Sequence, residues 1–191
     1  MAKLKADPDN IHPHDNVVRH VRNCSTRHGA KPILIVVHAT QGANVKGVSD
    51  LKGLGDWFDN PAAQASSHVA TDAEGHSARF VADELKAWHV AFFNSVSLGI
   101  EQVGFAEQKA WPDAQLQETA RWVGRWAHAY GIPIRQGRVS LDGRIIKSGV
   151  VRHSDLGNLG GGHHDPGSDY PFAEVLRIGR GYLHLLQKAG K

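Results

Sequence analysis

The segment ILIVVHATQG, residues 33–42, contains the longest aliphatic run in the chain. A short continuous apolar run that ends at polar residues and a glycine is typical of a strand buried on both faces. We therefore expect a central strand here, followed by a turn at Gly42. The strand ends at His38, and polar side chains at strand ends are where open α/β sheets gather their functional sites.

Other elements are expected on both sides of this strand. The spacing of apolar residues predicts helices over residues 48–58, 112–130 and 172–187, and a short helix near 16–22. A hairpin is expected over residues 66–82 with its turn at 72–75, and strands over 96–104 and 149–153. This order predicts an α/β fold, a single domain with a central mixed β-sheet flanked by helices.

Residues 1–30 are polar and show little periodicity, so we expect an N-terminal arm followed by one domain over residues 31–191. The Trp122 and Trp126 pair of the long helix is expected to pack rather than to bind sugar. The four histidines of the arm, His12, His14, His20 and His28, are given no function.

The composition excludes several classes of protein. The chain has 191 residues, a formal net charge of +3 and one cysteine, so no intramolecular disulfide is possible. The basic residues are scattered and their excess is small, which tolerates an anionic cell-wall polymer but argues against nucleic acid. We expect no signal peptide and no membrane insertion, synthesis in a bacterial cytoplasm, and a monomer.

Three residues form a candidate metal site. His38 closes the first strand, His153 closes the strand GVVRH, and Asp165 follows twelve residues later in HHDPG. Two histidines and one carboxylate are a common catalytic zinc set that leaves a fourth position open. Taken singly, each histidine is more often a surface or hydrogen-bonded residue, and Asp-Pro-Gly is an ordinary turn signal.

Two further residues accompany this set. Pro166 favours an extended conformation at Asp165, so His163 is expected on the same side as Asp165 and His164 on the other. Glu101 lies within the strand SLGIEQVG, where an acidic residue is either functional or an ion-pair partner. Near a metal that activates water, a glutamate serves as general base.

These segments together resemble the zinc-dependent N-acetylmuramoyl-L-alanine amidases of the type 2 class, which include phage enzymes, anhydro-muropeptide amidases and peptidoglycan recognition proteins. The matching stretches are ILIVVHAT, ASSHVATDAEG, KAWHV, NSVSLGIEQVG and GVVRHSDLGNLGGGHHDPG, which occur in the family's order over about residues 33–172. The last stretch looks most like phage and prophage forms.

The resemblance implies that His38, His153 and Asp165 bind Zn²⁺, that Glu101 activates water and that His163 stabilises the oxyanion. His68 and Trp88 match positions that line the substrate groove. The implied reaction is hydrolysis of the amide between N-acetylmuramic acid and L-alanine of peptidoglycan, by a phage or prophage endolysin. The alternatives are a cytoplasmic muropeptide-recycling amidase and a non-catalytic peptidoglycan-binding module. Residues 135–149 are not assigned to a family stretch and are expected to shape the groove.

Overall fold

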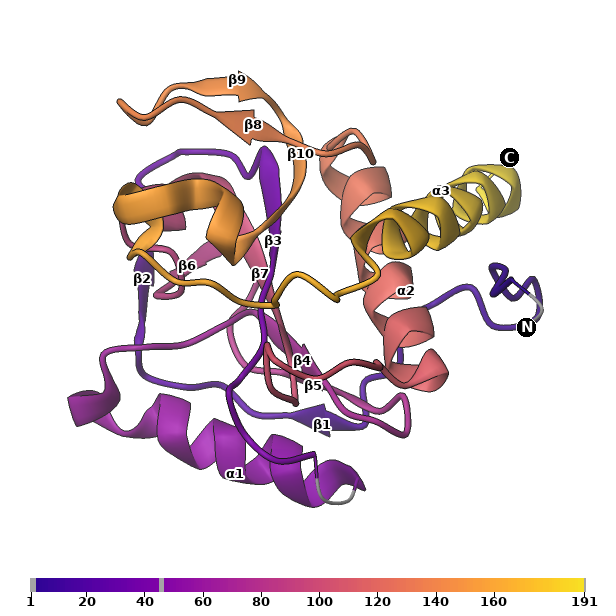
Figure 1. Cartoon of the computed structure of the whole chain (residues 1–191), viewed down its shortest axis with the longest axis horizontal. Coiled ribbons are helices and arrows are strands. Elements are labelled where there is room, and N and C mark those ends of the chain that lie inside the picture. Colours follow the sequence, from indigo (N-terminus) through magenta and orange to yellow (C-terminus); the bar gives the residue numbers. More distant parts are fainter. Residues whose placement is uncertain (1–2, 45–46, 191) are drawn as a thin grey trace.

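A six-stranded mixed sheet forms the centre of the computed structural model, which describes residues 3–44 and 47–190 (Figure 1). Its strand order is β1-β5-β4-β7-β3-β10. All neighbouring strands are parallel except the antiparallel β4–β5 hairpin. The strands are β1 (Val17–Val18), β3 (Leu34–Val37), β4 (Val69–Thr71), β5 (Ser77–Arg79), β7 (Ser97–Gln102) and β10 (Gly149–Arg152).

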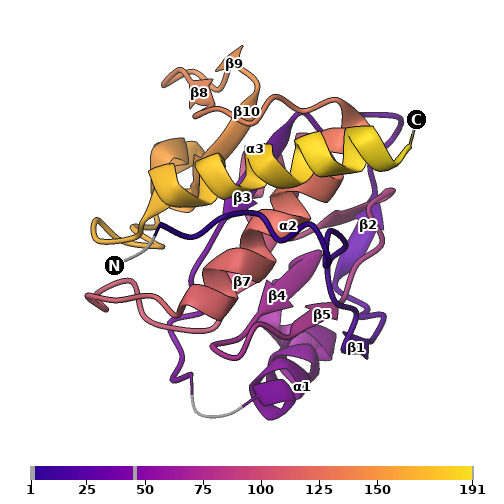
Figure 2. The same ribbon diagram turned by 90° about the vertical axis from the view of Figure 1, so that its right-hand side faces the viewer.

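Helices cover both faces of this sheet. The α-helices are α1 (Gly47–Asp59), α2 (Asp113–Tyr130) and α3 (Phe172–Ala189), and the 3₁₀ segments are η1 (Pro61–Ala63), η2 (Ala91–Val96) and η3 (His153–Gly160). Helices α2 and α3 pack together on one face, with α3 crossing α2 in Figure 2. No helix within the described residues is long and apolar enough to cross a membrane. The expected mixed α/β architecture is therefore confirmed.

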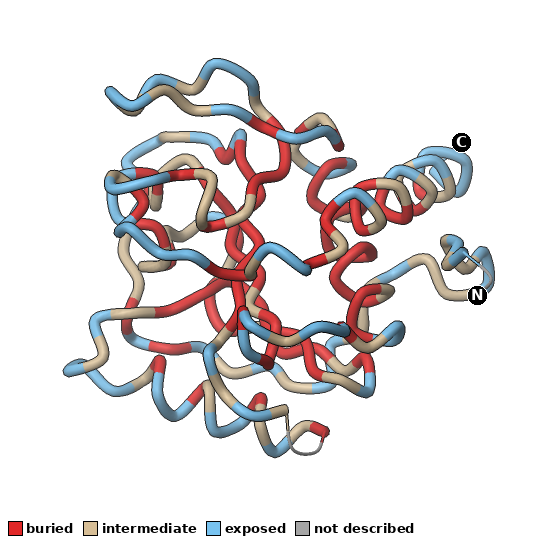
Figure 3. The backbone as a smooth tube through the Cα atoms, viewed as in Figure 1, coloured by how far each residue is buried: buried red, intermediate tan, exposed pale blue. Residues whose placement is uncertain are grey.

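The central strand is buried on both faces, as its aliphatic run predicts. Ile35 and Val37 of β3 pack toward α2 and α3, whereas Leu34 and Val36 pack on the opposite side. Figure 3 shows the buried backbone running through the middle of the sheet. Successive side chains of a strand point to opposite faces, so His38, which follows Val37, lies on the face away from α2 and α3.

The N-terminal residues differ from expectation in one respect. The short helix expected near residues 16–22 is wrong: β1 lies there and pairs in parallel with β5. A strand of two residues at the edge of the sheet is too short to show a recognisable alternation of apolar and polar side chains. A second strand, β2 (Cys24–Thr26), pairs with β6 (Leu85–Ala87) in a separate two-stranded sheet.

Arg27, which follows β2, connects the N-terminal residues to the segments before and at the start of β7. It is buried, and its guanidinium donates to the carbonyl oxygens of Asp83, Asn94, Ser95 and Ser97. Burying a cation is tolerated when its donors are satisfied. Arg27 thereby fixes η2 and the start of β7, which carry residues of the site.

The segment that sequence patterns left unassigned is a hairpin. Strands β8 (Arg138–Val139) and β9 (Ile145–Lys147) pair in antiparallel fashion beyond the edge of the central sheet (Figure 1). Val139 and Ile145 anchor it to a cluster that contains Phe93 and Leu156.

Candidate metal centre

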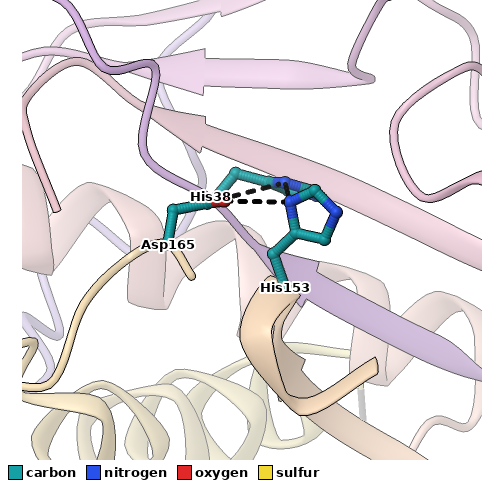
Figure 4. A group of neighbouring side chains, drawn as sticks. All are labelled: His38, His153 and Asp165. Atoms are coloured by element: carbon teal, nitrogen blue, oxygen red, sulfur yellow. Dashed lines mark hydrogen bonds and ion pairs between the residues drawn. The ribbon is translucent and has the colours of Figure 1, made fainter. Parts of the chain in front are cut away.

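His38, His153 and Asp165 meet at the carboxyl ends of neighbouring strands. His38 follows β3, His153 follows β10, and Asp165 comes from the loop after η3 (Figure 4). Because β3 and β10 are parallel and adjacent, their ends bring the two histidines together. All three residues are buried, and their potential ligand atoms lie within 4.8 Å of one another.

The hydrogen bonds around His38 define which ring nitrogen is free. The Ser97 hydroxyl donates to Phe93 O, so its oxygen accepts from His89 Nε2 at 3.0 Å. His89 Nδ1 then accepts from His38 Nε2 at 2.9 Å. Since Nε2 of His38 carries the hydrogen, its Nδ1 presents a lone pair to the site. Burial lowers the pKa of His38 to about 4, which favours this neutral form.

His153 is oriented in the same way. Its Nε2 lies 2.8 Å from the carbonyl oxygen of Gly160, which only accepts, so the hydrogen is on Nε2 and Nδ1 has a lone pair. The Nδ1 atoms of His38 and His153 lie 3.0 Å apart. Asp165 adds Oδ1 at 3.1 Å from His153 Nδ1 and Oδ2 at 3.5 Å from His38 Nδ1.

Asp165 is a charged ligand. Ala39 N donates to its Oδ2 at 3.1 Å. A carboxylate that accepts a backbone hydrogen bond is favoured in its charged form, which is the form that binds a metal.

This donor set fits a divalent metal such as Zn²⁺. Two nitrogen lone pairs and a carboxylate converge on one point, and such an arrangement repels itself unless a cation lies between the donors. A histidine that ligates zinc characteristically donates its other N–H to a backbone carbonyl or another acceptor, and both histidines do so here. Two histidines with one carboxylate leave a coordination position for water or substrate.

Glu101 lies beside the donor set. Its Oε1 is 3.9 Å from His38 Nδ1, and its Oε2 is buried without a hydrogen-bond partner among the described residues. Leu98 and Ile100 face the helices, so Glu101 faces the cleft by the alternation of β7, as the sequence predicts. Burial, helped by the negative charge of Asp165, raises the pKa of Glu101 to about 8.

The two histidines of HHDPG lie on different sides of their loop. The His163 ring stacks on the His153 ring with centroids 4.4 Å apart, and it lines the cleft. His164 Nε2 instead contacts Glu107 Oε1 at 3.0 Å on the surface. Gly161 permits the turn before these histidines, because its φ of +107° favours glycine. A Cβ atom at this position would also lie only 3.0 Å from His163 Cδ2.

A cleft of about 560 Å³ opens over these residues. Trp88 lines it and donates from Nε1 to Ser25 Oγ at 3.0 Å. The structure does not bring His68 to the cleft. His68 is fully buried, with Nδ1 accepting from Gly99 N at 2.9 Å and Nε2 lying 2.8 Å from Arg27 Nη2. This location corrects the expectation that His68 lines the groove, because both of its nitrogens are committed to the interior.

Sequence reasoning missed His89. It lies directly after Trp88 in KAWHV, and the only signal was its place in a quoted family stretch. Gly99 makes room for it, since a Cβ at position 99 would lie 2.5 Å from His89 Nδ1. Burial lowers the pKa of His89 well below its usual value, so His89 is a neutral acceptor for His38.

Solved structures share this fold. The AmpD crystal structure superposes with a TM-score of 0.66 and 20% identity, covering 92% of this chain and 99% of that one. The endolysin N-acetylmuramoyl-L-alanine amidase LysCS from Clostridium intestinale gives a TM-score of 0.56 and 19% identity, covering 85% of this chain and 95% of its own.

Sequence comparison agrees with the site. N-acetylmuramoyl-L-alanine amidase A from Achromobacter lyticus is 25% identical over 150 residues, which cover 75% of this chain and 81% of that protein. The family model of N-acetylmuramoyl-L-alanine amidases matches residues 28–168, a span that contains the whole candidate metal centre. The chain therefore belongs to the N-acetylmuramoyl-L-alanine amidase family, whose substrate is peptidoglycan.

Proposed function

We propose that this protein is a zinc-dependent amidase that cleaves the amide between the lactyl group of N-acetylmuramic acid and L-alanine of the stem peptide. The observation that carries the proposal is the convergence of the His38 and His153 lone pairs with the Asp165 carboxylate in the cleft. When bound there, Zn²⁺ acidifies water and polarises the scissile carbonyl.

Glu101 is assigned the proton transfer. Its carboxylate lines the cleft next to His38, and Oε2 has no partner among the described residues that would compete for a proton. In the proposed reaction Glu101 takes a proton from the attacking water and delivers it to the amine of L-alanine as the C–N bond breaks. Such positioned acid–base catalysis contributes about 100- to 10,000-fold.

His163 is assigned to the oxyanion. Its side chain is 60% exposed within the cleft, and stacking on His153 fixes the plane of its ring. From this position a ring N–H donates to the carbonyl oxygen as negative charge develops on it. Trp88, which forms part of the cleft wall, is assigned a contact with the substrate.

We further infer that the protein acts as an endolysin on intact peptidoglycan. The inference is supported by the phage-like character of GVVRHSDLGNLGGGHHDPG and by the fold shared with the endolysin LysCS from Clostridium intestinale. A recycling amidase is the second candidate, supported by the likeness to AmpD.

Digestion of purified peptidoglycan tests the proposal. New alanine amino groups and new reducing sugar ends are measured separately. Amines alone should increase, a chelator should abolish the increase, and Zn²⁺ should restore it. Binding to the wall without new ends would instead identify a recognition module.

The same assay separates the two physiological roles. An endolysin should release amines from intact sacculi at a rate comparable to that from soluble muropeptides. A strong preference for soluble anhydro-muropeptides would identify the recycling enzyme.

A further inference from the structure

The segment that contains the β8–β9 hairpin, residues 135–149, has a net charge equal to that of the whole chain. Residues 135–149 contain four basic residues and one acidic residue, an excess of three. The whole chain has 22 basic and 19 acidic residues, so the remainder has eighteen of each and is neutral. The net positive charge of the chain therefore comes from this one segment, although basic residues occur throughout the sequence.

Two of these basic residues lie opposite each other. Arg138 of β8 pairs in register with Lys147 of β9, and both are exposed. Like charges placed directly across two strands destabilise a sheet. Among the residues that the structure describes, neither side chain forms an ion pair or a hydrogen bond that relieves this repulsion.

Of the other two basic residues of the segment, one has an acidic partner and one donates to a backbone carbonyl. Arg144 pairs with Asp142 at 3.1 Å, and Arg135 Nε donates to Ser148 O at 3.2 Å. Arg138 and Lys147 are thus the two basic residues of the segment whose cationic groups have neither an ion-pair nor a hydrogen-bond partner among the described residues.

Arg138 and Lys147 border a surface cavity of about 470 Å³. The acidic residue that also lines it, Asp155, is already bound by Arg152 at 2.8 Å through Nη2 and 3.2 Å through Nε. The cavity therefore presents two uncompensated cations to solvent. It shares no lining residue with the catalytic cleft.

We propose that this cavity binds phosphate groups and docks the protein on a phosphate-bearing anionic polymer of the cell wall. Guanidinium and ammonium groups placed side by side recognise phosphate through charge-assisted hydrogen bonds. Arg135 and Arg144 are exposed in the same segment and offer further cationic groups to a polymer with repeated phosphates. The choice of a wall polymer rests on the proposed function, whereas phosphate binding itself does not.

The composition of the hairpin favours this polymer over two other polyanionic surfaces. Residues 135–149 contain no aromatic side chain on which nucleic-acid bases would stack. These residues expose only two large apolar side chains, Leu141 and Ile146. A membrane-binding element exposes a larger apolar surface than two side chains provide.

Titration of the full-length protein with long-chain inorganic polyphosphate is the first test. The double variant R138A/K147A should bind at least about tenfold more weakly, since each lost charge-assisted contact contributes on the order of a factor of ten. The matched control K52A/K188A removes two exposed lysines on α1 and α3, and it should bind as the unmodified protein does. Equal binding by the two double variants would overturn the proposal.

The variant R138E distinguishes a loss of polyphosphate binding from a loss of folding. A glutamate opposite Lys147 forms a cross-strand ion pair, so the melting temperature should stay equal or rise while polyphosphate binding is lost. Retained polyphosphate binding by R138E would refute the site.

Two further comparisons identify the polymer. Walls stripped of phosphodiester polymers should retain less protein than untreated walls, and amidase activity on stripped peptidoglycan should be unchanged in R138A/K147A. Equal retention on both walls would overturn the wall assignment. So would tighter binding to duplex DNA or to phosphatidylglycerol vesicles than to polyphosphate.

Discussion

The Nδ1 atoms of His38 and His153 lie 3.0 Å apart, although the partners of their Nε2 atoms leave a lone pair on each. Neither nitrogen is able to donate to the other, so the contact is repulsive in the absence of a cation. Asp165 adds negative charge at 3.1 Å from His153. The fold supplies the rigidity that keeps these donors together, because both histidines follow paired parallel strands.

Removal of the metal should lower stability. A ligand bound at 100 to 1,000 times its Kd stabilises the native state by about 3–4 kcal/mol, which corresponds to a fall in Tm of roughly 5–15 °C on removal. Calorimetry with and without a chelator measures this shift. His153→Ala should have no such shift, because one ligand is lost. A chelator-dependent shift of normal size in His153→Ala would exclude this residue as a ligand.

His89→Ala should weaken metal binding without removing a ligand. His89 orients His38 through the 2.9 Å contact with Nε2, and loss of such a partner typically costs about 10- to 100-fold in affinity. Competition with a chromogenic chelator measures the affinity. His128→Ala, on the exposed face of α2, is the control and should bind metal normally. Normal affinity in His89→Ala would show that His38 needs no such support.

Gly99→Ala should disturb the same contact from the opposite side. The added methyl group would lie 2.5 Å from His89 Nδ1 and must displace the ring. Overpacking of this kind costs about 1–3 kcal/mol, and metal affinity should fall as in His89→Ala. Gly53→Ala has open space around its Cβ and should not destabilise the protein. Denaturant unfolding and the chelator assay together test whether the glycine is required for space.

His163→Ala and His164→Ala should have different effects. His163 lines the cleft and stacks on His153, so its loss should lower kcat by about 100- to 1,000-fold with metal retained. His164 contacts Glu107 at the surface, so its loss should change activity little. Zinc content and amine release are measured for both proteins. The reverse pattern would contradict the assignment.

Glu101→Gln should abolish most activity while preserving the fold. The amide has the shape of the carboxylate but does not carry the proton, so amine release should fall by about 100- to 10,000-fold. The melting temperature should remain close to that of the unmodified protein, because Glu101 Oε2 has no partner to lose among the described residues. Glu107→Gln, at the surface, is the matched control and should remain active.

Local patterns predicted the strongest elements. The aliphatic run of β3, the apolar spacing of α2 and the turn between β4 and β5 each follow from residues close together in the chain. The short strands β1 and β2 escaped prediction because two or three residues carry no recognisable period. Their conformation depends on partners more than fifty residues away.

The sequence by itself determined a mixed α/β domain and the opposite orientations of His163 and His164. It also identified the candidate site residues His38, His153, Asp165 and Glu101. Strand ends and alternation are local properties, so they can be read from the chain. Only the tertiary structure decided that His68 is interior and that His89 supports His38. It also revealed that Arg138 faces Lys147 across the hairpin. These relationships depend on which strands become neighbours, and the free energy that selects those neighbours is the burial of side chains distant in sequence.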